Sequence, residues 1–173
     1  HYREMRDELQ TAHDMQMDLL PETPPELTGY TVDGLLVPAN NVGGDYFHYR
    51  WLDDEHEKFA IIIADVSGKA MEAAVTALRF NEVLRYECRG RTSPIDIAVG
   101  LNDSLDGQID TATFITCCIA VVEIATGQVE LVNAGHCPPI QVGMKSGLAI
   151  PVELTGLPLG IPTVLRQNQF YES

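Results

Sequence analysis

The stretch Phe59-Ala-Ile-Ile-Ile-Ala-Asp-Val-Ser-Gly-Lys69 holds an unbroken apolar run that stops abruptly at a carboxylate. A short continuous run of this kind, residues 59–64, is typical of a strand that is buried on both faces. Because Asp65 follows the run directly, its carboxylate is expected at the rim of the sheet, facing an adjacent cleft. The sequence therefore predicts a buried strand that places a carboxylate at one end of a sheet.

A second carboxylate stands upstream in Val42-Gly-Gly-Asp45, directly before the aromatic, extended segment 46–52. Its two glycines allow the backbone to approach a ligand closely. If the strands around Asp45 and Asp65 pair, both carboxylates can converge on one point. Hard divalent cations prefer oxygen ligands, and two of them about 3.5–4 Å apart can hold a hydroxide and polarise a phosphoryl oxygen. Each motif alone also fits an ordinary role, with Asp45 as a turn residue and Asp65 or Ser67 as the N-cap of the next helix.

The remaining pattern predicts strands on both sides of one pair of helices. Residues 71–88 have apolar side chains at helical spacing, and Ser93-Pro94 gives an N-cap and a first-turn proline for a helix that ends near Leu105. Strands are expected at residues 30–37, 46–52, 59–64, 113–124, 128–133, 140–142 and 148–154. This order indicates an α+β fold with a largely antiparallel sheet or sandwich.

Residues 2–20 are expected to form a helix, which Pro21 and the prolines after it end. Its seam positions alternate at spacings of three and four, as in a heptad: Tyr2, Met5, Leu9, Ala12, Gln16 and Leu19. The seam covers fewer than three heptads, so two interpretations stay open. The helix either continues from an upstream domain as a connector or packs on its own domain. We divide the chain into a connector helix at 1–20 and a main domain at 21–173.

Composition restricts the classes of partner. The formal net charge is −14, which argues against a nucleic-acid partner, because phosphate backbones are bound by clustered Lys and Arg. No run of 18 apolar residues is present, so we expect no membrane span, and the polar start of the chain predicts a cytoplasmic location without a signal peptide. The four cysteines lack metal-site spacing and are expected to be reduced and packed.

The order of these motifs resembles the SpoIIE-like branch of the PPM-type protein serine/threonine phosphatases. The resemblance is carried by residues 16–21, 38–39, 42–46, 65–69, 73–74, 101–102, 114–116, 126–127, 133–136, 138–139 and 156–160. It covers about residues 16–160, and the collinear set is far more specific than any single motif. His136, which alone would be interpreted as a structural loop histidine, belongs to this set.

The resemblance implies a fold, a reaction and a set of ligands. The fold would be a β-sandwich of two largely antiparallel sheets flanked by helices, with two manganese or magnesium ions at one rim. Asp65 would bridge both ions, Asp45 would bind one of them, and the backbone carbonyl of Val66 would be a further ligand. A metal-activated water would attack phosphoserine or phosphothreonine in line, without a phosphoenzyme. The substrate or switch region around these ligands would contain Gly44, Ser67, Gly68 and His136.

The resemblance also implies partners. Substrates of this branch are often phosphorylated anti-anti-sigma factors of the STAS fold. An upstream sensor or receiver domain often controls the phosphatase through a connecting helix, and residues 2–20 suit that role.

Three departures from the family pattern affect these expectations. Ala70 stands where glycine is usual, and Ser67 stands where the eukaryotic branch has a histidine, so the general acid is not identified. The family's last strand and its later metal-binding aspartates are not matched, which implies a domain truncated at its C-terminus. We therefore expect this chain alone to bind at most one ion, weakly, and to have little activity. An unpaired strand edge would allow a homodimer.

Two other functions fit the same residues. The chain could be a non-catalytic relative that binds a regulatory partner, or another hydrolase that uses carboxylate-bound metal ions. The presence of both Asp45 and Asp65 favours the phosphatase, because a binding module need not keep two carboxylates at a sheet rim.

Overall fold

The computed structural model describes residues 2–38, 42–154, 156–161 and 171–172. Within these ranges the chain forms three helices, α1 (Tyr2–Met17), α2 (Ala70–Glu87) and α3 (Pro94–Leu105). The strands are β1 (Glu26–Leu27), β2 (Tyr30–Thr31), β3 (Asp45–Trp51), β4 (Lys58–Val66), β5 (Ile115–Glu123), β6 (Val129–Ala134), β7 (Ile140–Val142), β8 (Ala149–Pro151) and β9 (Tyr171–Glu172). Residue 39, which belongs to the motif at 38–39, lies outside the described residues.

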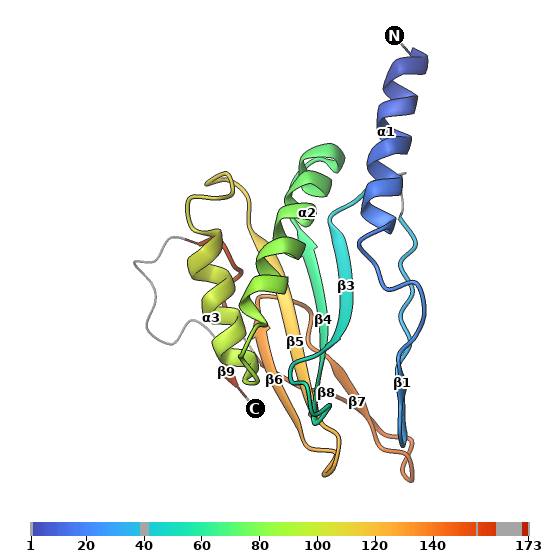
Figure 1. Cartoon of the computed structure of the whole chain (residues 1–173), viewed down its shortest axis with the longest axis vertical. Coiled ribbons are helices and arrows are strands. Elements are labelled where there is room, and N and C mark those ends of the chain that lie inside the picture. The colour runs from blue at the N-terminus through green and yellow to red at the C-terminus, as the bar shows by residue number, and fades with distance from the viewer. Residues whose placement is uncertain (1, 39–41, 155, 162–170, 173) are drawn as a thin grey trace.

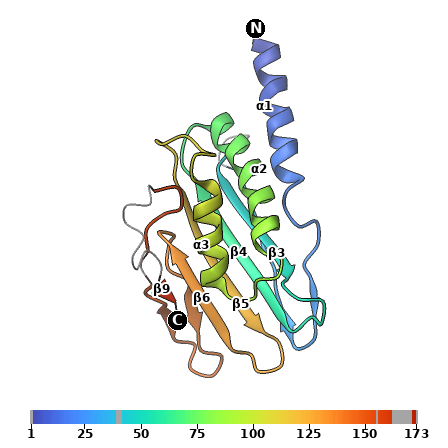
Figure 2. The ribbon, with the colours of Figure 1, turned by 60° about the vertical axis from the view of Figure 1, so that its left-hand side comes forward.

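The centre of the fold is one antiparallel sheet with the strand order β3-β4-β5-β6-β9. Helices α2 and α3 cover one face of this sheet, and the hairpins β1-β2 and β7-β8 lie on the other (Figures 1 and 2). The α+β class with largely antiparallel strands is thereby confirmed. The second layer consists, in the described ranges, of these two hairpins.

Strand β4 shows why the helices pack on one face. Ala60, Ile62, Ala64 and Val66 are buried in the same cluster as apolar residues of α2 and α3, whereas Ile63 on the opposite face is 47% exposed. Side chains of a strand alternate between faces, so one apolar run supplies both a helix-covered face and an open one. Asp65 falls on the open face, next to the rim.

Helix α2 is fixed against the edge strand β3 by one buried polar contact and one ring contact. The Tyr46 hydroxyl donates a hydrogen bond to Asn81 Oδ1 over 2.6 Å, and its ring meets Phe80 edge-on at a centroid distance of 5.3 Å. Because a buried hydroxyl without a partner is costly, this bond also determines how the helix sits on the strand. The N-cap of α2 is Lys69, so the alternative assignment of Asp65 or Ser67 as N-cap is wrong.

One strand prediction fails. Residues 30–37 form only the two-residue strand β2, and the chain from Val32 to Pro38 is irregular. Leu35 and Val37 are 85% and 75% exposed. A β-rich composition makes a strand only where a neighbouring strand offers hydrogen bonds and a face to pack on. Residues 32–38 have no such partner strand among the described residues.

Helix α1 projects beyond the body at its N-terminal end and packs on it near its C-terminal end (Figure 1). Met5 is 56% exposed, whereas Ala12 is buried with Val42 and Ala74, and Leu9 packs against this cluster. None of the helices in the described ranges combines the length and apolar character that a membrane span requires. The four cysteines are free thiols; Cys88, Cys117 and Cys118 are buried, whereas Cys137 is exposed, so the expectation of packed cysteines is wrong for Cys137.

Candidate metal centre

Asp45 and Asp65 lie directly opposite each other. Strands β3 and β4 pair in a register that aligns their Cα atoms, and both residues are exposed at the rim of the sheet. Directly opposed side chains in an antiparallel pair have Cβ atoms about 4.5–5.5 Å apart. Burial raises the pKa of the Asp65 carboxyl, and the nearby Asp45 charge raises it further, while His136 acts in the opposite direction. A carboxylate whose ionisation is opposed by a second carboxylate beside it favours a cation at that place.

The loop before β3 is pressed against the end of β4. The Val66 amide donates a hydrogen bond to the Gly44 carbonyl over 3.0 Å. A Cβ on residue 44 would lie 2.1 Å from the Val66 carbonyl oxygen, so only glycine fits there. A Cβ on Gly43 would meet no described atom within 4 Å. The glycine pair was predicted to let the backbone approach a ligand; in the structure Gly44 instead lies against the backbone of Val66.

Gln16 of α1 holds this loop from the other side. Its side-chain amide nitrogen donates to the carbonyl oxygens of Gly43 and Asp45 over 2.8 and 3.0 Å, and its oxygen accepts from the Gly43 amide over 3.1 Å. The side chain is only 2% exposed. Sequence reasoning placed Gln16 in an apolar seam and missed this role, although a polar residue at a seam position was the available signal.

His136 is fixed in orientation beside the two carboxylates. Its Nδ1 lies 2.8 Å from Thr116 Oγ1, and Thr116 is the register partner of Asp65 in the neighbouring strand. Asn133 binds the His136 backbone twice, accepting from its amide over 2.7 Å and donating to its carbonyl over 2.9 Å. Burial lowers the pKa of His136, and the charges of Asp65 and Asp45 raise it in part.

Ser67 and Gly68 shape the turn between β4 and α2. The Ser67 amide donates to the Phe114 carbonyl over 3.0 Å, and the Phe114 amide donates to Ser67 Oγ over 2.9 Å. Gly68 has φ +126°, a conformation that side-chain-bearing residues rarely adopt. The Ser67 hydroxyl thus binds the backbone that leads into β5.

A hollow of about 250 Å³ adjoins Asp45, and its lining also includes His136, Leu35, Val37 and Ile63. It lies on the open face of the sheet. An apolar wall beside charged oxygen atoms can exclude water from a bound group.

The described residues fit part of a divalent-cation site. Two carboxylates and the Val66 carbonyl are hard oxygen donors. The Val66 carbonyl lies so close to Gly44 that a side chain at position 44 would not fit. No cluster of three or more His, Cys, Asp or Glu side chains able to hold a metal occurs in the described part of the chain. The oxygen donors present are therefore two side chains and one backbone group.

The sequence profile for Stage II sporulation protein E (SpoIIE) matches residues 55–171. That range includes Asp65, Val66 and His136, whereas Asp45 lies before it. Among curated proteins, the phosphoserine phosphatase RsbU of Bacillus subtilis (strain 168) is 27% identical over 97% of this chain and 49% of its own length. The phosphoserine phosphatase RsbP of the same organism is 25% identical over 89% of this chain and 38% of its own. The chain thus spans about half or less of the length of these relatives.

The fold agrees with that match. The solved SiaA-PP2C domain of Pseudomonas aeruginosa superposes with a TM-score of 0.77 over 99% of this chain and 67% of its own, at 14% identity. Such low identity supports the fold alone. With the profile match over most of the sequence, the conclusion is that this chain belongs to the SpoIIE family and has the fold of a PP2C domain.

Proposed function

We propose that this domain hydrolyses phosphoserine or phosphothreonine in a regulatory protein by means of a metal-activated water. The observation that carries the proposal is the register of β3 and β4, which sets Asp45 opposite Asp65 at the rim of the sheet. Phosphoryl transfer to water needs positioned oxygen ligands for cations rather than a nucleophilic side chain.

In this proposal Asp65 would hold both ions, Asp45 would hold one of them, and the Val66 carbonyl would be a further ligand. Manganese or magnesium bound there would supply Lewis-acid chemistry and a water of lowered pKa. The chain's own contribution is geometric, because Gly44 brings the loop onto Val66 and Gln16 holds that loop in place. The neighbouring His136 and the turn at Ser67 and Gly68 would position the phosphorylated side chain.

The substrate we propose is a phosphorylated anti-anti-sigma factor, and the location is the cytoplasm. Relatives named as phosphoserine phosphatases support the phosphorylated side chain as substrate. The identity of the protein that carries it rests on the family resemblance.

We also propose that α1 connects the site to an upstream sensor or receiver domain. The exposed N-terminal end of the helix and its packed C-terminal end suit that role, because movement of the first would reach the loop at Asp45 through Gln16. Leu9→Asp, which disturbs the packed part of the seam, should uncouple activity from the upstream signal in the intact protein. An unaltered signal response in that variant would mean that the helix only packs.

The proposal is tested by the release of phosphate from a phosphoserine peptide by the intact protein, with and without manganese. Asp65→Asn should lower the rate by several orders of magnitude, because it removes a ligand shared by both ions. Asp103→Asn, a change of the same kind on the exposed side of α3, should leave the rate unchanged. Circular dichroism would establish that each variant is folded.

Two outcomes would reject the mechanism. One is full activity of folded Asp65→Asn, and the other is activity that does not depend on a divalent cation. A folded, metal-binding intact protein without hydrolytic activity toward any phosphopeptide would favour the alternative of a non-catalytic, partner-binding domain.

A further inference from the structure

A second hollow, of about 410 Å³, lies at the other end of β3 from Asp45. Arg50 stands five positions after Asp45, which corresponds to about 17 Å along an extended strand. The residues that define its character come from the β3–β4 hairpin and from the end of α2: Arg50, Trp51, His56, Arg85, Cys88 and Arg89. The metal centre described above does not use this hollow.

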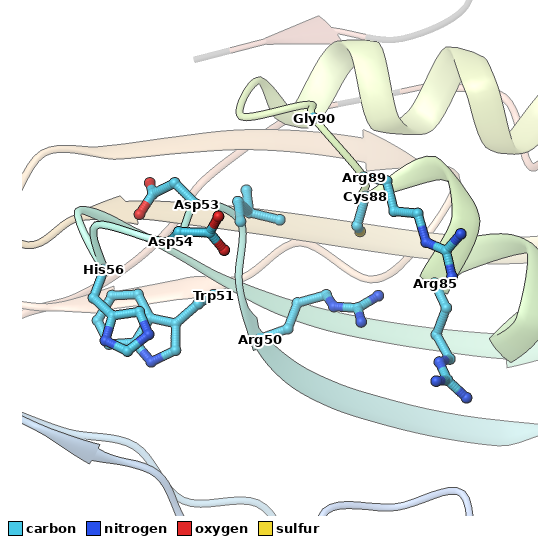
Figure 3. Close-up of a pocket in the computed structure, with 10 residues that line it drawn as sticks. Arg50, Trp51, Asp53, Asp54, His56, Arg85, Cys88, Arg89 and Gly90 are labelled. Carbon is cyan, nitrogen blue, oxygen red and sulfur yellow. The ribbon is translucent and has the colours of Figure 1, made fainter.

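Three guanidinium groups gather here although the protein is strongly acidic. The whole chain has 11 Lys and Arg against 25 Asp and Glu. Arg50 lies on the same face of β3 as Tyr46, the face that meets α2. Its side chain extends toward the end of α2, where Arg85 and Arg89 lie (Figure 3). On an acidic molecule, a local positive region attracts a small anion, whereas the negatively charged remainder of the surface repels it.

Among the described residues, two of these three charges lack a carboxylate partner. Arg85 lies 3.5 Å from Glu82, in an exposed pair. In the described part of the chain, Arg50 and Arg89 have no carboxylate within 4.0 Å. Two carboxylates, Asp53 and Asp54, also line the hollow (Figure 3). Asp53 accepts hydrogen bonds from the amides of residues 57 and 58.

The charges of the arginines affect the pKa values of neighbouring side chains. Burial lowers the pKa of His48, and the charges of Arg50 and Arg85 lower it further. Burial raises the pKa of the Cys88 thiol, and Arg50 beside it opposes that rise. After burial, which is the larger cause, the positive charges of Arg50 and Arg85 thus act on His48, and that of Arg50 acts on Cys88.

We propose that this hollow binds a small phosphomonoester, with the phosphate on the arginines and the organic part toward Trp51 and His56. Planar guanidinium groups match the oxygen atoms of a phosphate with paired hydrogen bonds. The rings of Trp51 and His56 stack at a centroid distance of 4.5 Å and lie at the hairpin end of the hollow, away from Arg85 and Arg89 (Figure 3). The volume falls within the range of small-molecule sites, about 300–1,000 Å³.

Trp51 provides a direct readout because it is the only tryptophan of the chain. The protein would be titrated with inorganic phosphate and with glycerol phosphate in the presence of EDTA, and its intrinsic fluorescence followed. We expect a saturable change with both ligands. Sodium chloride at the same ionic strength should produce no saturable change.

The test variants and their control each replace one arginine with glutamine, so each loses one positive charge. Arg50→Gln and Arg89→Gln should each weaken phosphate binding by about tenfold or more, because each removes a charge-assisted contact. Arg6→Gln, which removes the same charge from exposed α1, should bind as the unmodified protein does. Because Arg89 is exposed, its replacement leaves folding intact even if Arg50→Gln does not.

Several results would overturn the proposal. These are a titration without saturation, equal effects of chloride and phosphate, or unchanged affinity in both Arg50→Gln and Arg89→Gln. Loss of the signal in Asp65→Asn would place the bound phosphate at the metal centre instead. Retention of phosphate binding in Asp65→Asn supports a separate site.

Discussion

Gly43 and Gly44 are neighbours with different physical constraints. At Gly44 the Val66 carbonyl occupies the space that a side chain would need, whereas Gly43 has room. We therefore expect Gly44→Ala to destabilise the fold by about 1–3 kcal/mol, as overpacking does, and to weaken manganese binding. Thermal unfolding and isothermal titration would measure the two effects.

Gly43→Ala is the matched control for that prediction. It keeps both backbone bonds to Gln16 and should change the free energy of unfolding by no more than about 0.5 kcal/mol. If the two alanine variants behave alike, the contact between Gly44 and Val66 does not constrain the loop.

Asp45 and Asp65 should repel each other when no cation is bound. Like charges directly opposite on paired strands are destabilising by roughly 0.2–1 kcal/mol. In EDTA, Asp45→Asn should therefore stabilise the domain slightly and lower the pKa of Asp65, since the Asp45 charge contributes to raising it. Thermal unfolding and carboxyl NMR would measure these changes. Destabilisation by Asp45→Asn in EDTA would contradict the repulsion.

The pH dependence of the same pair has a definite sign. Because the folded-state pKa of Asp65 is raised, the folded protein binds this proton more readily than the unfolded chain does. Stability of the metal-free domain should fall as pH rises through the window between the ordinary and the raised pKa. The slope of stability against pH in that window should become smaller in Asp45→Asn.

At the scale of elements, the contact between α1 and the β3 loop depends on one side chain. Gln16→Ala leaves the Gly43 and Asp45 backbone groups without this partner, and a lost buried hydrogen-bond partner costs about 1–3 kcal/mol. Denaturant unfolding should show that loss. Manganese affinity should fall as well, because the loop carries Asp45.

Gln10→Ala separates this effect from a general change in the helix. Gln10 lies on the exposed side of α1 and bonds only to Asp14 in the described structure, over 2.9 Å. It should change stability by no more than about 0.5 kcal/mol. Equal losses in the two variants would show that helix propensity, rather than the loop contact, is the cause.

The elements that the sequence predicted well are those with strong local signals. Strand β4 follows from its apolar run, and α3 from Ser93 and Pro94, although Ser93 makes no side-chain cap bond. The pairing of β3 with β4 depends on contacts between distant residues, so the sequence left it conditional. The segment 30–37 was predicted wrongly because strand composition does not reveal whether a partner strand is present.

At the scale of the whole molecule, the net charge of −14 should lower stability through self-repulsion. Added salt shortens the screening distance from about 30 Å at 0.01 M to about 3 Å at 1 M. The melting temperature in EDTA should therefore rise with sodium chloride and with choline chloride alike. A melting temperature that does not change with either salt would mean that the charges are too dispersed to matter.

The candidate site was predicted from the sequence in part. Its two carboxylates could be named, because Asp45 and Asp65 stand in distinctive local patterns, and their opposition in register agrees with convergence on one point. Their assignment as metal ligands stays a prediction. The arginine hollow could not be found in this way, because Arg50 and Arg89 are far apart in sequence and ordinary in their local settings.

The bond from the Gly43 amide to Gln16 has a consequence for amide hydrogen exchange. This hydrogen can be replaced by deuterium only when the side chain at the end of α1 releases it, whereas the Val66 amide is released only when the loop separates from β4. The two amides therefore report two separate opening events at the same loop. If the end of α1 detaches first, Gly43 exchanges faster than Val66, and an upstream signal that loosens the helix would accelerate Gly43 alone.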